Sequence, residues 1–133
     1  MRVLIVQSKE ALGALWSRHL ERLGISVMRV TSGVDAVEMI ERERYDAILL
    51  DLVLHDGSAL TVADVAYFRQ PAANVIFVTD TTFFSDGSIF SHSANARAFV
   101  ESQTPPEDIA AIVHHYGRSP SRDRAARRNP AGG

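Results

Sequence analysis

Short apolar runs alternate with longer segments of helical spacing through the first 117 residues of the chain. Two of these runs, residues 3–6 and 47–50, are apolar without interruption, which is typical of strands buried on both faces of a parallel sheet. β-Branched and aromatic residues mark three further runs as strands. The expected strands cover residues 3–6, 26–31, 47–50, 74–79 and 96–100.

Between the strands, apolar residues recur three and four positions apart, as on one face of a helix. We expect helices that begin at Ser8, Ser32-Gly33, Gly57-Ser58 and Pro105-Pro106, with stops at Gly24 and Gly117. The serine-rich segment 80–95 predicts a short or irregular helix. The expected apolar faces are Leu12, Leu15, Trp16, His19, Leu20 and Leu23; Val34, Val37, Met39 and Ile40; Leu60, Val62, Ala63, Val65, Ala66 and Phe68; and Ile109, Ile112, Val113 and Tyr116.

Five strands alternating with about five helices predict a doubly wound, flavodoxin-like α/β fold, with a five-stranded parallel sheet and helices on both faces. In such sheets the functional groups gather at the carboxyl ends of the strands. The residues that follow the expected strands are therefore the candidates for a site: Gln7, Ser8, Asp51, Thr79, Asp80, Glu101 and Ser102.

The bulk composition fits one domain of 133 residues, 46% of them hydrophobic. The chain has no cysteine, which excludes disulfides, thiolate metal sites and a cysteine nucleophile. The apolar runs are too short to span a bilayer, and the N-terminus has no signal-peptide core. We expect a soluble, cytoplasmic protein with no membrane partner.

Charge is distributed unevenly along the chain. The net charge is −2, but residues 118–133 hold five arginines and a single aspartate. That tail has no apolar periodicity and cannot bury enough surface to offset the entropy of ordering it. We therefore divide the chain into a domain at residues 1–117 and a disordered, Arg-rich tail at residues 118–133. The body is acidic and carries no nucleic-acid-binding motif, so we expect no nucleic-acid partner.

One combination of residues carries the strongest functional signal. Asp51 ends an apolar strand, Gly57 follows six residues later, Thr79 follows twenty-eight residues later, and Phe99 lies in the last strand. Each feature alone is weak, but together they resemble the receiver domain of two-component response regulators over residues 1–117. The resemblance implies that Asp51 is equivalent to the phosphoacceptor, and that Thr79 and Phe99 are equivalent to the switch residues.

The chain departs from this family where the family places its charges. Receivers that accept phosphate have two acids after the first strand, which hold Mg²⁺, and a lysine after the fifth; the matching positions here are Gln7, Ser8 and Ser102. Phosphoryl transfer depends mainly on positioning and charge neutralisation. Since about 1.4 kcal/mol of lost stabilisation slows a reaction tenfold, this degenerate pocket predicts poor transfer. We expect no metal, no cofactor and no catalytic residue; Mg²⁺ enters only if Asp51 is phosphorylated after all.

Each candidate residue also has a structural interpretation. Asp51 can be a strand-end acid satisfied by hydrogen bonds or by Lys9, which is close enough in sequence to occupy the metal's place. Thr79 suits a strand, and Phe99 suits the core. The adjacent His114 and His115 would point about 100° apart on a helix, so they do not share an ion readily.

Three functions follow from these observations. The first is an atypical, stand-alone receiver that acts as a non-enzymatic interaction module, with a histidine kinase or a downstream regulator as partner. It could also form a homodimer through the face of the fourth helix, fifth strand and fifth helix, about residues 83–116, which includes Phe83 and Phe84. The second is a working single-domain response regulator phosphorylated on Asp51 by a histidine kinase. The third is an unrelated flavodoxin-like enzyme or nucleotide binder, although no phosphate-binding loop follows the first strand.

Overall fold

The computed structural model describes residues 1–79 and 96–118. The elements are β1 (Arg2–Val6), α1 (Glu10–Arg22), β2 (Ser26–Val30), α2 (Gly33–Arg42), β3 (Ala47–Asp51), α3 (Ala59–Arg69), β4 (Asn74–Thr79), β5 (Ala96–Glu101) and α4 (Pro106–Arg118). From β1 to β4, strands and helices alternate along the chain, as the hydrophobic pattern predicts.

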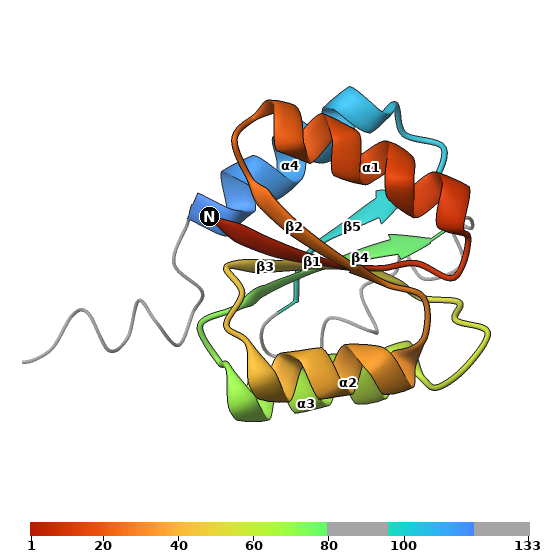
Figure 1. The fold of residues 1–133 in the computed structure, drawn as a ribbon, viewed down its shortest axis with the longest axis vertical. Helices are drawn as coiled ribbons and strands as arrows, with labels where there is room; N and C mark the ends of the chain where they lie inside the picture. Colours follow the sequence, from red (N-terminus) through yellow and green to blue (C-terminus); the bar gives the residue numbers. More distant parts are fainter. Residues whose placement is uncertain (80–95, 119–133) are drawn as a thin grey trace, which may run out of the picture.

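The five strands form one parallel sheet in the order β2-β1-β3-β4-β5. Helices α1 and α4 pack together over one face, and α2 and α3 pack together over the other (Figure 1). The chain winds from β1 to β2 in one direction and from β2 onward in the other, and right-handed crossovers then place α1 opposite to α2 and α3. The doubly wound, five-stranded α/β fold is confirmed.

The sheet separates two apolar cores. Strand residues that point to alternate faces belong to different clusters: Leu4 and Leu50 pack with α2 and α3, whereas Ile5 and Leu49 pack with α1 and α4. Strands β1 and β3 are almost wholly buried because they lie inside the sheet between the two helix layers. These central strands give the site at their carboxyl ends a rigid base.

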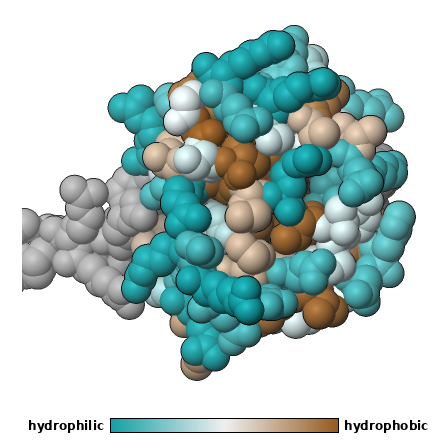
Figure 2. Space-filling model, viewed as in Figure 1, coloured by the Kyte–Doolittle hydropathy of each residue, from teal (hydrophilic) through white to brown (hydrophobic). Residues whose placement is uncertain are grey.

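The surface seen from the β2 edge is mostly polar. Figure 2 shows hydrophilic residues over the helices and hydrophobic residues across the middle of this side, where β2 runs. Met28 of β2 is 39% exposed, as an edge strand allows. In the described parts of the chain, the helices are too short and too polar to cross a membrane.

Two of the expected serine caps are present and one is wrong. Ser32 accepts a hydrogen bond from Asp35 N, and Ser58 accepts one from Thr61 N, so both cap their helices. Ser8 does not cap α1. Lys9 is the N-cap residue there, and it makes no side-chain cap bond because a lysine side chain has no acceptor. The Ser8 hydroxyl is bonded to Thr31 and His55 instead.

Four residues of the expected helix faces are exposed instead of buried: Leu23, Val34, Leu60 and Phe68. Each lies in the first or last turn of its helix or just beyond it. Helix α3 buries mainly small side chains: Ala59, Val62, Ala63 and Ala66. Phe68 is 81% exposed, so its inclusion in the core was wrong.

The helix stops are partly as expected. Gly24 has φ +80° directly after the C-cap of α1, a conformation that favours glycine. Gly117 does not stop the last helix, which continues to Arg118. Gly117 is buried there, and a Cβ on it would meet Met1 Sδ at 2.8 Å.

Three predictions fall outside the described residues. The first is the irregular helix within residues 80–95, with Phe83 and Phe84. The second is the candidate site residue Asp80, and the third is the disorder of the Arg-rich tail, of which residues 119–133 lie outside. All three stay predictions.

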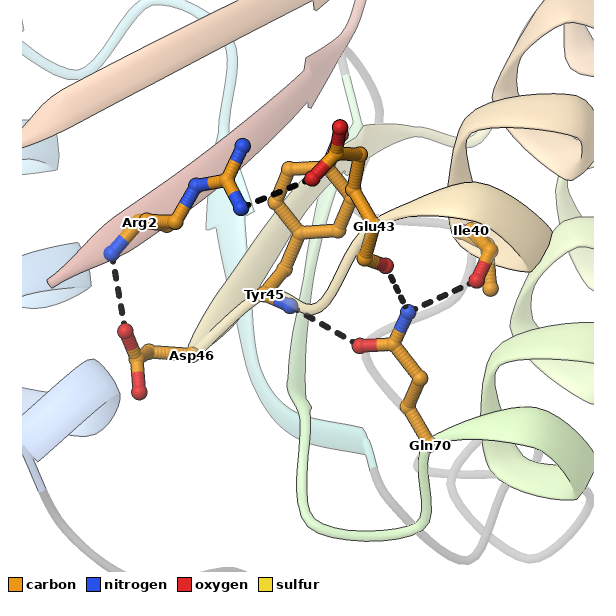
Figure 3. A network of polar contacts seen from close by, with 6 residues as sticks. All are labelled: Arg2, Ile40, Glu43, Tyr45, Asp46 and Gln70. Atoms are coloured by element: carbon orange, nitrogen blue, oxygen red, sulfur yellow. Dashed lines mark hydrogen bonds and ion pairs between the residues drawn. The ribbon is translucent and has the colours of Figure 1, made fainter.

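A buried glutamine ties the helices to the sheet at its amino edge (Figure 3). Gln70, the C-cap residue of α3, accepts a hydrogen bond from Tyr45 N at 2.9 Å. Its amide nitrogen donates to the carbonyls of Ile40, at 2.7 Å, and of Glu43. One side chain thereby satisfies the end of α2 and the approach to β3, where backbone groups would otherwise be buried without partners.

Candidate functional site

The candidate residues meet at the carboxyl edge of the sheet. Gln7 follows β1, Asp51 ends β3 and Thr79 ends β4. The strands are in parallel register, with Val6 opposite Leu50 and Asp51 opposite Val78. Neighbouring strands therefore deliver their terminal side chains to one edge, as the fold predicts.

Gln7 is bonded directly to Asp51. The amide nitrogen of Gln7 donates to Asp51 Oδ2 at 2.6 Å, and its amide oxygen accepts from Lys9 N at 2.9 Å. The side chain is only 2% exposed. The opposite amide orientation would place an oxygen against the carboxylate and an NH₂ against an N–H, so the two partners fix the orientation.

Lys9 does not take the place that its sequence position allowed. Its side chain is exposed. Among residues 1–79 and 96–118, Lys9 forms no ion pair with Asp51. The prediction that Lys9 could satisfy Asp51 is wrong: a neutral amide from the same loop does so instead. Gln7 reaches the carboxylate because it directly follows β1, the strand beside β3.

The second oxygen of Asp51 is also bonded. Val53 N donates to Asp51 Oδ1 at 2.8 Å, which turns the loop after β3 back toward the carboxylate. The Asp51 side chain is half-buried. Each carboxylate oxygen thus accepts a hydrogen bond from a neutral donor.

Ser8 joins two other loops. Its hydroxyl donates to Thr31 O at 2.9 Å and accepts from His55 N at 3.0 Å. Thr31 follows β2, and His55 lies in the loop after β3. The hydroxyl contacts neither oxygen of Asp51 and faces the flanking loops.

The remaining candidates that the structure describes lie at or near the ends of β4 and β5. Thr79 is buried at the end of β4, and Ser102 N donates to Thr79 O at 2.8 Å. Phe99 of β5 stacks on Phe77 of β4, with ring centroids 5.2 Å apart and planes at 22°. Phe99 is half-buried and packs against the core beneath α2 and α3, so its ring points inward in this structure.

A comparison with protein families assigns the fold. The sequence profile of the response regulator receiver domain matches residues 3–114. This chain belongs to that family. It is a receiver domain of two-component signalling, and the hypothesis of an unrelated flavodoxin-like enzyme or nucleotide binder is wrong.

Individual relatives agree with this assignment. Over 75 residues, 56% of this chain and 16% of the relative, the chain is 33% identical to the regulatory protein LuxO of Vibrio cholerae. The receiver domain of a putative LuxO repressor from Vibrio parahaemolyticus superimposes with a TM-score of 0.80, at 23% identity, covering 98% of this chain and 97% of that one. The receiver domain of the Pseudomonas aeruginosa sensor kinase PA1611, described with a coordinated magnesium ion, gives 0.77 at 21% identity, covering 89% and 98%.

The chain covers only a small part of the length of its curated relatives. It spans about a sixth of the length of the LuxO proteins. The activities of those whole proteins reside in sequences several times longer.

The residues of this pocket do not fit a magnesium ion held by acids. Mg²⁺ requires oxygen ligands in near-octahedral geometry, usually with one or two carboxylates among them. The Gln7 amide presents N–H groups to Asp51, and its oxygen is already bonded to Lys9 N. Ser8 is bonded to two loops. In the described part of the chain, no group of three or more acidic, histidine or cysteine side chains is placed so that it could hold a metal ion.

Several contributors to the site had no sequence signal. Thr31 and His55 act through backbone atoms, which any residue would supply. Gly33 and Gly57 meet at close range, since a Cβ on either would lie 3.0 Å from an atom of the other's loop. Both glycines stand at expected helix starts, but nothing in a single sequence pairs them.

Proposed function

We propose that this chain is an atypical receiver that acts as a protein-interaction module in signalling, without Mg²⁺-dependent phosphorylation of Asp51. The supporting observation is the 2.6 Å hydrogen bond from the buried Gln7 amide to Asp51 Oδ2. A neutral donor lies where the family places an acid that holds the ion. Both oxygens of Asp51 therefore accept hydrogen bonds from the chain itself, one from Gln7 and one from Val53 N.

The electrostatics of transfer support the same conclusion. An incoming phosphoryl group brings negative charge beside a carboxylate, and catalysis of the transfer consists largely of positioning the groups and neutralising that charge. Gln7, Ser8 and Ser102 are all neutral. A loss of several kcal/mol of transition-state stabilisation corresponds to a rate lower by orders of magnitude.

The partners of such a module are proteins. Receiver domains interact with histidine kinases and with downstream regulators, and either would bind this chain without a phosphate signal. A homodimer through about residues 83–116 is a second mode of assembly; of that face, the structure describes β5 and α4. The module would act in the cytoplasm, perform no catalysis itself and need no cofactor.

The alternative is a working response regulator that is phosphorylated on Asp51. It is favoured by the position of Asp51 at the end of β3, beside the strand that ends in Thr79. On this alternative, Gln7 would have to leave Asp51 when the metal binds. The experiment that separates the two functions is therefore a phosphorylation assay.

The protein is incubated with acetyl phosphate and Mg²⁺, and its intact mass is followed with time. We expect no phosphoryl adduct on the wild-type chain, and none on Asp51→Asn. An adduct that saturates in the wild type and disappears in Asp51→Asn would overturn the proposal and establish the alternative.

A gain-of-function variant tests whether the missing acids and lysine explain weak Mg²⁺ binding. Gln7→Asp, Ser8→Asp and Ser102→Lys, combined, restore two acids and a cation to the positions that the family uses. We expect this variant to bind Mg²⁺ on the order of a hundredfold more tightly than wild type, measured by calorimetry. A folded variant whose Mg²⁺ affinity equals that of wild type would contradict our explanation of the pocket.

A further inference from the structure

The carboxyl edge of the sheet holds three loops together through one hydroxyl. Ser8 lies in the loop after β1, Thr31 in the loop after β2, and His55 in the loop after β3. The Ser8 hydroxyl uses its proton for Thr31 O, at 2.9 Å, and a lone pair for His55 N, at 3.0 Å. A hydroxyl can serve as donor and acceptor at once, which is what bridging a carbonyl and an N–H requires.

Other contacts limit the same loops. Gly33 N donates to Asp56 O at 2.6 Å, which joins the loops after β2 and β3 a second time. A Cβ on Gly33 would lie 3.0 Å from Asp56 O, and Gly57 has φ +87°. Val53 N is held by Asp51 Oδ1. Leu52 N also donates to Val78 O at 2.8 Å, so the loop from Asp51 to Gly57 is attached at four points, of which Ser8 makes one.

We propose that Ser8 is a positioning residue that holds the loops after β2 and β3 in one conformation without a metal ion. A coordinated ion joins loops by attracting their oxygens; here a hydroxyl joins them by hydrogen bonds. The inference deepens the proposed function, and rests on it only for the consequence that this edge does not respond to Mg²⁺. The geometry of the Ser8 bridge stands independently of whether Asp51 is phosphorylated.

The chemistry of residue 8 supplies a graded set of variants. Ser8→Thr keeps a donor and an acceptor. Ser8→Asp can accept from His55 N but, when ionised, places a negative charge against Thr31 O. Ser8→Ala can do neither. Their effects should follow the number of bridge bonds each retains, with Thr closest to wild type and Ala and Asp farther from it.

Native-state amide hydrogen exchange, measured by NMR, reads the bridge at the His55 N–H. In Ser8→Ala, we expect exchange at His55 to be roughly tenfold faster, with Ser8→Thr within about twofold of wild type. The matched control is Ser32→Ala, the same substitution in the neighbouring loop. It should speed exchange at Asp35, whose N–H Ser32 accepts, and leave His55 unchanged.

Two results would overturn the inference. One is unchanged exchange at His55 in Ser8→Ala; the other is an equal change at His55 in Ser32→Ala, which would indicate general loosening. If Ser8→Ala does not fold, Ser8→Val replaces it, because valine has the shape of threonine but neither donates nor accepts a hydrogen bond. Equal exchange at His55 in Ser8→Thr and Ser8→Val would then count against the bridge in the same way.

A magnesium titration distinguishes failure of this inference from failure of the proposed function. If Mg²⁺ slows exchange at His55 in the wild type, the proposed function is wrong, whereas the comparison of Ser8→Ala with Ser8→Thr still tests the bridge. If Mg²⁺ has no effect and Ser8→Ala also has none, the bridge alone is wrong.

Discussion

Two buried glutamines hold opposite ends of the same sheet, and they bond to different kinds of partner. Gln70, at the amino edge, is 6% exposed and contacts only backbone groups. Gln7, at the carboxyl edge, is 2% exposed and contacts one backbone N–H and one carboxylate. A buried amide alone therefore does not mark a functional site; the chemistry of its partners does.

The amino edge is a structural network. Beside Gln70, Arg2 N donates to Asp46 Oδ2 at 2.8 Å, and the Arg2 guanidinium pairs with Glu43 at 2.9 Å and lies over the Tyr45 ring (Figure 3). A hollow of about 270 Å³ lies at this edge, lined by Arg2, Tyr45 and Gln70 among others. The contacts join the start of β1 to the segment between α2 and β3.

The carboxyl edge differs because its glutamine stands against an ionisable group. The carbonyls that Gln70 contacts are neutral and need a hydrogen-bond donor under all conditions, so we expect Gln70 to keep these contacts. A carboxylate can exchange an amide donor for a metal ion when acids are present to hold one. Here the acids are absent, and Gln7 remains the partner of Asp51.

The largest expected change in stability follows from disrupting the hydrogen bonds of Gln70 at the amino edge. Gln70→Ala leaves Tyr45 N and the carbonyls of Ile40 and Glu43 without their partner, which should cost about 3 kcal/mol of unfolding free energy. Urea denaturation followed by the fluorescence of Trp16, the single tryptophan and 1% exposed, measures it. Gln103→Ala, at an exposed position, is the matched control and should change stability by less than about 0.5 kcal/mol. Equal stability of the two variants would contradict the role of Gln70.

A smaller effect separates the two glutamines. A double-mutant cycle with Gln7→Ala and Asp51→Ala should give a coupling energy of about 1.5 kcal/mol. Each single variant loses the same hydrogen bond to a charged group, and the double variant loses that bond only once. The carboxylate is half-buried, so solvent reduces the value. The measurement is urea denaturation of all four proteins. Additive effects would mean that the 2.6 Å contact contributes nothing to stability.

The sequence pattern predicts this fold more completely than it predicts the site. Apolar runs define the strands because a parallel strand buried on both faces needs apolar residues throughout. The helix faces are less well defined: Phe68 is exposed at the end of α3, while three alanines of that helix are buried. Hydrophobicity gives the periodicity of a helix but not the angle at which it meets the sheet.

The sequence predicts where the site lies but not the hydrogen bonds within it. The strand order brings Gln7 beside Asp51, and both stood among the expected candidates. The role of Ser8 could not be found locally, because its partners lie 23 and 47 residues away and are backbone atoms. Gln70 gave no signal for the same reason: its contacts are 25 to 30 residues distant.

The smallest expected effect tests the amino edge by pH. The Tyr45 hydroxyl is buried, and among the described residues it has no hydrogen-bond partner. Burial raises the pKa of Tyr45 above its ordinary value of 10.0; Arg2 opposes this shift, and Glu43 adds to it. The folded state therefore holds the phenolic proton more tightly than the unfolded state. The contribution of Tyr45 is complete below about pH 10 and is lost as the pH rises through the raised value.

Tyr45→Phe should remove both the cost of the buried hydroxyl and the contribution of Tyr45 to the dependence of stability on pH. We expect it to raise the unfolding free energy by about 1 kcal/mol at neutral pH, because a hydroxyl without a partner is no longer buried. The loss of stability above about pH 10 should also become shallower. Urea denaturation at neutral and alkaline pH measures both. A destabilised variant with an unchanged alkaline slope would show that the hydroxyl has a partner.

The central claim is that the Gln7 amide has replaced the metal ion beside Asp51. The most direct test is a titration of the wild-type protein with millimolar Mg²⁺, following the side-chain NH₂ resonances of Gln7 and the backbone amide of Val53 by NMR. Our account predicts that neither resonance moves, since the amide keeps its bond to Asp51 throughout. A saturable shift of both, absent from Asp51→Asn, would show that the ion displaces Gln7 and would contradict the account.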